Sequence, residues 1–447
     1  MPTRTILVLL TIIALGGCLP EPERPSSTNG PSADVGVDAD PGEPDADPGE
    51  PDADPGEPDA DPGEPDADPG EPDADPGEPD ADPGEPDADP VEPYDPGPCD
   101  GDFGEDFEVY AVDGAGFWRT YSAPTATNGA VIAGAQAGTV RVIHVDGEGQ
   151  VLGEHAIPGN DVYGIATNDT SFALLVQRAN DVLALVVREF SGNTLEDKTL
   201  IGDVDTTVEG NEWFGHLLRD GRITWTGEHW AAYYTLTRMW PDGVGHYGDQ
   251  LRLFEADGSD HTTVWGWGCS HSMEVQIAHN GERLGPVCSS DCYPNKGVHF
   301  NHQTFIYPDE GLSNCAGGYG TSLGASIPVD GGFWIPFTAT DDRDSHDVAV
   351  VHIEGWGTVG EVLWLTEDDV DATFLNGANF GEDIVVAFRQ GTEDRFYLLD
   401  GDDGSVLTGP EVLPEANLGS VLNFFVYSNG DVGWVQGAEL ARLRSCD

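Results

Sequence analysis

Four cysteines gather within 47 residues in the second half of the chain, and histidines lie among them. The residues of interest are Cys269, His271, Cys288, Cys292, His299, His302 and Cys315. Thiolates and imidazoles are preferred zinc ligands, so Cys269, His271, Cys288 and Cys292 could form a zinc site. The same cysteines could instead form two disulfides, as exported proteins often do. We favour disulfides and predict no metal site. Four cysteines allow three pairings, and the expected strand register favours Cys269–Cys292 with Cys288–Cys315.

Two histidines occupy comparable positions at the start of strand-like runs. His271 is followed by Ser272 and lies 20 residues before Asp291, and His216 lies one such run earlier. A histidine beside an acid can act as a general base or hold a metal. His216, His271, Ser272 and Asp291 are therefore the catalytic candidates, and Ser322 and Asn376 could join them. No complete catalytic set is evident. A histidine at a strand end is also commonly just a polar residue at the rim of the fold.

Three further motifs resemble sites of known chemistry but lack a required part. Gly320-Thr-Ser-Leu-Gly324 has the spacing of a serine nucleophile elbow, which needs a following helix, and the next residues are strand-like. The acid-rich turns Asp341–Asp347 and Asp400–Gly404 lack the full calcium-loop spacing. We therefore expect no cofactor, with calcium the one option left open at these turns.

The segments that must position these residues are patterned as strands. Typical apolar runs are rich in β-branched and aromatic residues and are Val140–Val145, Val182–Val187, Val348–Ile353, Ile384–Phe388 and Phe396–Leu399. Several are apolar at consecutive positions, which indicates burial on both faces of a sheet. No amphipathic helix of useful length is evident, so the pattern predicts an all-β fold.

Turn dipeptides that favour tight hairpins recur every 40 to 59 residues from residue 128 onward. They are Asn128-Gly129, Asn168-Asp169, Gly227-Glu228, Asn280-Gly281, Asp330-Gly331, Gly381-Glu382 and Asn429-Gly430. A second turn signal often follows, so each unit is expected to hold four strands. Repeats of this length predict a β-propeller, with seven blades favoured over six or eight. The region is similar to bacterial seven-bladed propellers in period and organisation, and no motif identifies a subfamily.

The last unit offers only three strands, which predicts how the ring closes. The missing fourth strand is expected from the N-terminal segment Asp106–Asp113, because closure from both chain ends removes exposed edges. Cys99 and Cys446 flank this seam and are expected to form a disulfide. Such a bridge closes a loop of over 300 residues, which the loop-entropy model values at ~5 kcal/mol.

A different composition precedes the predicted propeller. Residues 38–93 contain eight copies of Asp-Ala-Asp-Pro-Gly-Glu-Pro, with Val91 replacing one glycine. Each copy carries three carboxylates and two prolines and no large apolar group, so it cannot bury enough surface to fold. Residues 18–98 are therefore predicted to be a disordered, extended stalk.

The first 17 residues have the features of an export signal. Arg4 precedes the apolar run Ile6–Leu15, which is too short to span a membrane, and Leu15-Gly16-Gly17-Cys18 follows. This pattern resembles the signal of bacterial lipoproteins, and the resemblance implies cleavage before Cys18 and lipidation of its thiol. Leu19, in place of aspartate, implies sorting to the outer membrane. The predicted domains are a signal peptide (1–17), a lipid-anchored stalk (18–98) and a propeller (99–447).

The charge of the chain restricts its partners. Of 82 acidic and 18 basic residues, 28 acidic and two basic residues lie in residues 1–98, which leaves 54 acidic and 16 basic residues in the predicted propeller. Such a domain should not bind nucleic acid or reach a membrane except through its lipid. The sequence favours an envelope lipoprotein that displays a propeller to a protein or carbohydrate ligand, on the periplasmic side or the cell surface. The alternative is an extracytoplasmic hydrolase or lyase that works at the channel mouth.

Overall fold

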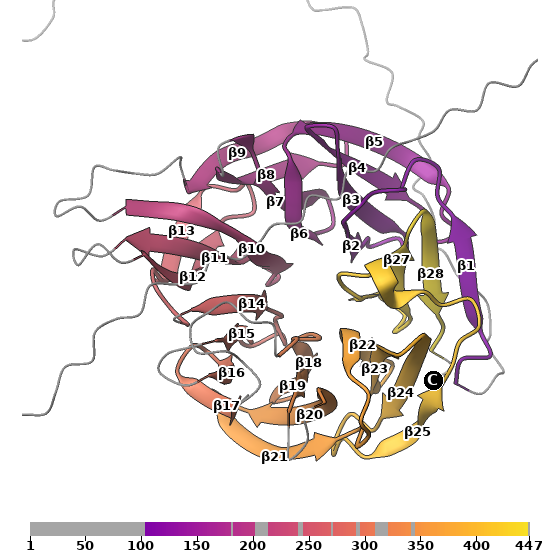
Figure 1. Cartoon of the computed structure of the whole chain (residues 1–447). Coiled ribbons are helices and arrows are strands. Elements are labelled where there is room, and N and C mark those ends of the chain that lie inside the picture. Colours follow the sequence, from indigo (N-terminus) through magenta and orange to yellow (C-terminus); the bar gives the residue numbers. More distant parts are fainter. Residues whose placement is uncertain are drawn as a thin grey trace, which may run out of the picture. The chain divides into compact units, whose positions relative to one another are not determined.

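The computed structural model describes residues 103–179, 182–201, 213–239, 245–269, 271–291, 296–308, 321–340 and 345–445, which belong to one compact unit. Their strands form seven four-stranded antiparallel sheets in a ring (Figure 1), as the sequence predicts. The predicted signal peptide and stalk lie outside the described residues.

In blades 1 to 6 the strands run outward from the central axis in chain order, and in blade 7 the outermost strand comes from the N-terminal segment. Blade 1 is β2 (Thr120–Pro124), β3 (Ala130–Gln136), β4 (Thr139–Val145) and β5 (Val151–Pro158). Blade 2 is β6 (Asp161–Thr167), β7 (Ser171–Gln177), β8 (Leu183–Glu189) and β9 (Thr194–Ile201). Blade 3 is β10 (Trp213–Trp225), β11 (Trp230–Met239), β12 (Gly245–Phe254) and β13 (Asp260–Trp265). Blade 4 is β14 (Ser272–Gln276), β15 (Val287–Ser290), β16 (Gly297–Phe300) and β17 (Thr304–Pro308). Blade 5 is β18 (Ile327–Val329), β19 (Gly332–Ala339), β20 (Asp347–Glu354) and β21 (Thr358–Trp364). Blade 6 is β22 (Ala372–Phe380), β23 (Asp383–Gln390), β24 (Glu393–Leu399) and β25 (Val406–Glu411). Blade 7 is β26 (Phe425–Val426), β27 (Val432–Gln436), β28 (Glu439–Leu443) and β1 (Phe107–Ala111).

All seven predicted hairpin dipeptides connect the first and second strands of a blade. Asn128 has φ 56° and Gly281 has φ 89°, in the left-handed region that Asn and Gly tolerate best. Because a tight turn depends on these few residues, its position could be read from local sequence.

Burial changes in the expected way from the middle of a blade to its outer edge. Every residue of β7 and of β19 is buried, because neighbouring blades cover both faces of these strands. The outermost strand β5 is largely exposed or half-buried. Most of the apolar core therefore lies between blades, where large side chains such as Trp230 and Trp434 are fully buried.

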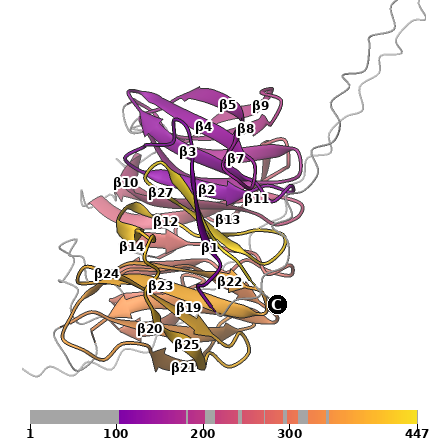
Figure 2. The same ribbon diagram turned by 90° about the vertical axis from the view of Figure 1, so that its right-hand side faces the viewer.

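The ring closes as predicted, through the N-terminal strand. β1 pairs antiparallel with β28, with Phe107 opposite Leu443. Figure 2 shows the indigo β1 lying against the yellow C-terminal strands. The buried Arg442 strengthens this seam by donating from Nε to Oδ2 of Asp431 at 2.7 Å and from Nη1 to the carbonyl of Asn128 in blade 1 at 3.5 Å. Cys99 and Cys446 lie outside the described residues, so their disulfide stays a prediction.

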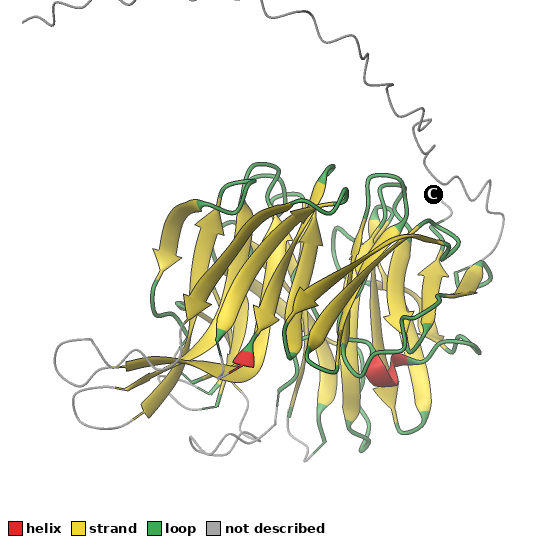
Figure 3. Cartoon of the chain, turned by 90° about the horizontal axis from the view of Figure 1, so that it is seen from above, coloured by secondary structure: helices red, strands yellow, loops and turns green. Residues whose placement is uncertain are grey.

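Helical structure in the described part of the chain is limited to short turns such as the 3₁₀ helix Leu418–Ser420 (Figure 3). Among these residues, no helix has the length and apolar character needed to cross a membrane.

Candidate functional site

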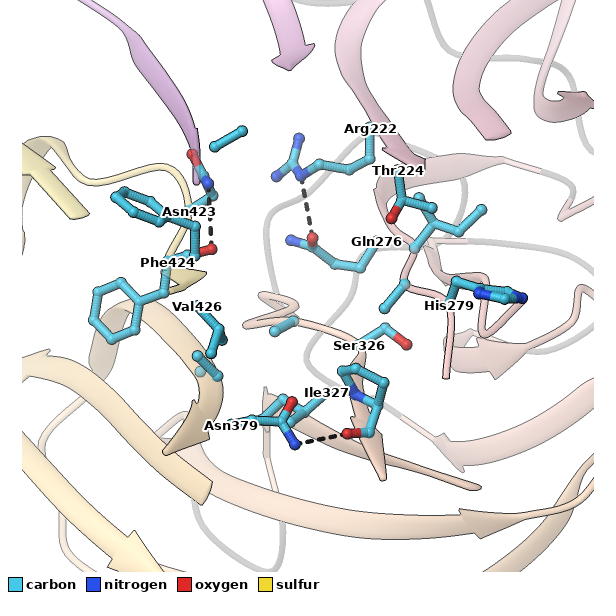
Figure 4. Close-up of a pocket in the computed structure, with 18 of the residues that line it drawn as sticks. Arg222, Thr224, Gln276, His279, Ser326, Ile327, Asn379, Asn423, Phe424 and Val426 are labelled. Carbon is cyan, nitrogen blue, oxygen red and sulfur yellow. Dashed lines mark hydrogen bonds between the residues drawn. The ribbon is translucent and has the colours of Figure 1, made fainter. Parts of the chain in front are cut away.

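The innermost strands of all seven blades surround an axial pocket of about 990 Å³. β2, β6, β10, β14, β18, β22 and β26 each contribute to its wall, together with the turns that follow several of them. Figure 4 shows side chains from opposite sides of the ring converging on this space.

The pocket stays open because the ends of the inner strands carry small residues. Its lining includes Ala123, Gly164, Ala166, Ala278, Gly324, Ala325, Gly377 and Ala378. Some of these residues also let neighbouring inner strands approach each other: a Cβ added at Gly164 would lie 3.2 Å from the Cα of Arg222. Small side chains therefore allow close packing of the ring and leave its centre empty.

Three side chains, which we call the polar floor, close the inner end of the pocket. They are Tyr121, Arg222 and Gln276, from blades 1, 3 and 4. Nε of Arg222 donates to Oε1 of Gln276 at 3.1 Å (Figure 4). Nη1 of Arg222 donates to the Tyr121 hydroxyl at 3.3 Å. Within the described residues, Nη2 of Arg222 and the buried Oγ of Ser326 in the pocket wall have no hydrogen-bond partner. Both atoms are therefore available to a ligand.

Four ionisable residues, which we call the charged layer, lie on inner strands or immediately before them. Three of the four precede a residue of the polar floor by two positions. They are Arg119, Asp161, Asp220 and Glu274. Asp220 forms an ion pair with Arg222, and its Oδ2 accepts from the backbone N–H of Val275 at 2.9 Å.

The charged layer and the polar floor form one network across five blades. Arg119 donates from Nη1 to Asp161 at 3.1 Å and from Nη2 to the Tyr121 hydroxyl at 3.3 Å. Oε2 of Glu274 accepts from the backbone N–H of Leu323 in the segment before β18 at 2.8 Å. The blades are thus cross-linked by polar contacts around the axis as well as by apolar contacts.

Glu274 is the titratable member of this network near neutral pH. Burial, and then the neighbouring Asp220 carboxylate, raise the pKa of Glu274 to about 7. Besides Glu274, the network contains two arginines and two aspartates, whose formal charges cancel. The network is therefore neutral overall when Glu274 is protonated.

The mouth of the pocket has a different chemistry from its floor. Asp330, Glu382 and Asp402 line it from turns of blades 5 and 6, and all three are exposed. In the pocket wall, the half-buried Phe424 just before β26 adds an apolar surface (Figure 4). Burial lowers the pKa of His279, so its ring is neutral at pH 7.

The sequence-predicted site residues lie at the opposite end of the inner strands from this pocket. His271 immediately precedes β14, whereas the pocket begins at Gln276, where β14 ends. Nδ1 of His271 lies 3.2 Å from Oδ1 of the buried Asp291, and His271 has φ 57°. The structure therefore brings these two candidates together. Ser272 is the first residue of β14 and pairs with Ser290.

The remaining candidates are dispersed. His216 lies in β10 opposite Leu236, and its side chain is outside the described part of the structure. The backbone N–H of Ser322 donates to Oγ1 of Thr338 at 2.9 Å, and the Ser322 side chain acts to lower the pKa of Glu274. Asn376 is buried in β22.

Sequence reasoning missed the charged layer and the polar floor, although a signal exists. Polar or aromatic pairs at i and i+2 recur on four inner strands or just before them: Arg119 and Tyr121, Asp161 and Tyr163, Asp220 and Arg222, Glu274 and Gln276. Residues spaced by two share one face of a strand. Comparing this spacing between repeats could have identified a common face toward the axis.

The predicted pairings of Cys269 with Cys292 and of Cys288 with Cys315 are both wrong. Cys269 and Cys288 form the disulfide, with Cα atoms 6.5 Å apart. Cys269 is held between blades 3 and 4, where it packs with Tyr233, Val275 and Cys288, and its backbone N–H donates to Asp249 at 3.1 Å. This seam places it against Cys288 of β15. The disulfide removes two thiolates from the alternative zinc site.

Cys292 and Cys315 lie outside the described residues, so a bridge from Cys292 or Cys315 is not tested. The segment after Ser322 leads into β18 and contains no helix, as expected for a chance serine motif. In the turn after β24, Oδ1 of Asp400 accepts from the backbone N–H groups of Asp402 at 2.9 Å and Asp403 at 3.2 Å, which gives this acid a structural role.

No protein-family model matches the chain, and no curated protein matches it. Among solved structures, it is similar to a streptogramin B lyase (TM-score 0.42, 10% identity, covering 76% of this chain and 97% of the lyase). It is also similar to the Dos1 propeller (0.41, 11%, 71% and 75%) and to a luciferin-regenerating enzyme (0.38, 10%, 76% and 95%). The strand pairing itself establishes the seven blades, and nothing about ligand or activity follows from these likenesses.

Proposed function

We propose that the propeller is a binding module whose axial pocket takes a neutral, hydroxyl-rich ligand of the oligosaccharide class. The observation that supports this most directly is the unpartnered Nη2 of Arg222 at the base of a pocket of about 990 Å³. That volume is at the upper end of the range for small-molecule sites.

The polar groups of the pocket suit a ligand that both donates and accepts hydrogen bonds. Nη2 of Arg222 can donate to a sugar oxygen, and the exposed carboxylates of Asp330, Glu382 and Asp402 can accept from hydroxyls. The ring of Phe424 offers an apolar face of the kind on which a sugar can pack. The acidic excess of the chain would repel an anionic ligand, which favours a neutral one.

We further propose that the module is displayed from the outer membrane by a lipid on Cys18. The lipoprotein-like signal and the acidic repeat support this display. A stalk of 80 residues could reach on the order of 250 Å if fully extended as polyproline II, far enough to hold a domain away from the membrane surface.

The pocket is tested by filling it. The mature full-length chain would be probed against immobilised neutral oligosaccharides, with Thr224→Trp in the pocket wall as the test variant. Thr194→Trp on the exposed outer strand β9 is the matched control. We expect the parent and the control to bind a common subset and Thr224→Trp to lose it. Equal binding by both variants, or no oligosaccharide bound by the parent, would contradict the proposal.

Display is tested separately. Cys18→Ser should move the protein from the membrane fraction to the soluble fraction without changing the thermal unfolding of the propeller. Removing residues 38–93 should leave oligosaccharide binding in solution intact and reduce capture of the same ligand by whole cells. Unchanged capture by cells would exclude a role for the stalk in display.

A second candidate, an extracytoplasmic hydrolase or lyase, is supported by the His271–Asp291 pair. A buried carboxylate beside an imidazole is the arrangement that orients a general base. His271→Ala would be assayed on saccharide, ester and lactone panels. Activity in the parent that disappears in a folded variant would favour catalysis over binding alone.

A further inference from the structure

A second cluster of chemically competent side chains lies away from the axial pocket, toward the outer part of blade 3. It consists of His229, Glu255 and His261, whose ligand atoms all lie within 4.8 Å of one another. We propose that this cluster binds a divalent transition-metal ion of the zinc class, independently of the pocket.

Three separate elements bring the ligands together. His229 lies in the turn between β10 and β11, Glu255 immediately follows β12, and His261 is in β13. Nδ1 of His261 is 2.8 Å from Oε1 of Glu255, and Nε2 of His229 is 3.5 Å from Oε2 of the same carboxylate. One carboxylate thus has an imidazole on each of its oxygens, and the two rings are 4.0 Å apart.

The backbone around the cluster is held by hydrogen bonds that do not use the ligand atoms. The backbone N–H of His229 donates to Oγ1 of Thr226 at 2.9 Å, and that of Glu255 donates to the Ser259 carbonyl at 2.9 Å. Nε1 of Trp230 donates to the Ala256 carbonyl at 3.0 Å and so connects the two turns. Such support lowers the entropic cost of assembling a coordination shell.

The donor set favours zinc over calcium. Two imidazoles and one carboxylate are borderline ligands that suit zinc, whereas calcium takes six to eight oxygens. Three protein ligands leave a fourth position open to water or to a partner's side chain. Side-chain exposures of 21%, 46% and 40% for His229, Glu255 and His261 leave the cluster accessible to an ion from solvent.

Nearby cations do not compete for the carboxylate in this structure. Lys198 and Arg252 contact Asp260, at 3.0 Å and 2.6 Å, and neither forms an ion pair with Glu255 among the described residues. The carboxylate oxygens of Glu255 therefore face the two histidines, at 3.5 Å and 2.8 Å.

Zinc binding by the mature, oxidised chain would be measured by titration calorimetry in millimolar calcium, which occupies carboxylate-only sites on the stalk. Cobalt substitution gives a second readout, because nitrogen ligation changes its visible spectrum. The test variant is His229→Ala with His261→Ala. The control is Glu228→Gln, which removes an exposed acid beside His229 but no proposed ligand.

We expect one equivalent of zinc to bind the parent and the control, and the double variant to bind it roughly 100-fold more weakly. The visible spectrum of cobalt should show nitrogen ligation with the parent and the control and should lose it with the double variant. The two substituted side chains are partly exposed, so the double variant should keep its circular dichroism spectrum. Absence of stoichiometric zinc in the parent, or equal affinity in the double variant, would overturn the proposal.

Discussion

The two ends of the inner strands differ in chemistry although they belong to the same seven strands. Toward one end, Arg119, Asp161, Asp220 and Glu274 hydrogen-bond between blades. Toward the other end, alanines and glycines line a pocket of about 990 Å³. The centre of a propeller ring is too wide for backbone contacts alone, so side chains must fill it or leave it open.

The difference has energetic consequences. A buried ion is tolerated only while its partners are in place, so the charged layer should be sensitive to single substitutions. The pocket end contributes little packing across the axis, so a new side chain there can enter open space. Stability should therefore depend on the first end and ligand binding on the second.

Asp220→Asn should have the largest effect on stability. The substitution removes the ion-pair partner of Arg222. In the parent, the backbone N–H of Val275 donates to the Asp220 carboxylate, and the asparagine could place its NH₂ group against that N–H instead. We expect the free energy of unfolding to fall by about 3 kcal/mol, measured by thermal and urea denaturation. Asp369→Asn, at an exposed acid, is the control and should be neutral. Equal stability of the two variants would show that the charged layer does not support the ring.

The pH dependence of stability should depend on Glu274. Because its folded pKa is raised to about 7, the native state holds a proton that the unfolded state releases above pH ~4.5. The free energy of unfolding should therefore decrease as pH rises from about 4.5 to about 7, and this contribution should then level off.

Glu274→Gln should flatten that decrease by about 1–3 kcal/mol across the window. A residual slope should remain, because burial also raises the pKa of Asp249 to about 7. The measurement is the melting temperature in buffers from pH 4.5 to 8, with Glu228→Gln retaining the parental slope. A variant with the parental slope would place the titration elsewhere.

Thr224→Trp should have the smallest effect on stability. Thr224 lines the pocket and is half-buried, so the indole can occupy open space instead of displacing core side chains. We expect a change within about 1 kcal/mol, together with the loss of ligand binding proposed above. A large destabilisation would mean that the pocket end is packed as tightly as the charged layer.

Much of the fold could be predicted because its signals are local. Asn128-Gly129 and Asn280-Gly281 mark hairpins through backbone conformations that few residues adopt. The three-strand last repeat then predicted a strand from Asp106–Asp113, and β1 occupies Phe107–Ala111. Strand identity, blade count and ring closure all follow from spacing along the chain.

Contacts between blades were harder to predict because they join residues far apart in sequence. In the sequence, three nearby cysteines were possible disulfide partners of Cys269. Its position between blades 3 and 4 brings it against Cys288, which is its partner. Arg222 meets Tyr121 across 101 residues, and no local rule specifies that distance.

By itself, the sequence determined the strands, their turns and the closure of the ring, because hairpin chemistry and side-chain alternation act over a few residues. The tertiary structure alone decided the polar floor, the charged layer, the disulfide partner and the His229–Glu255–His261 cluster. The physical reason is that the packing and relative placement of whole strands bring such side chains within hydrogen-bonding or coordination distance.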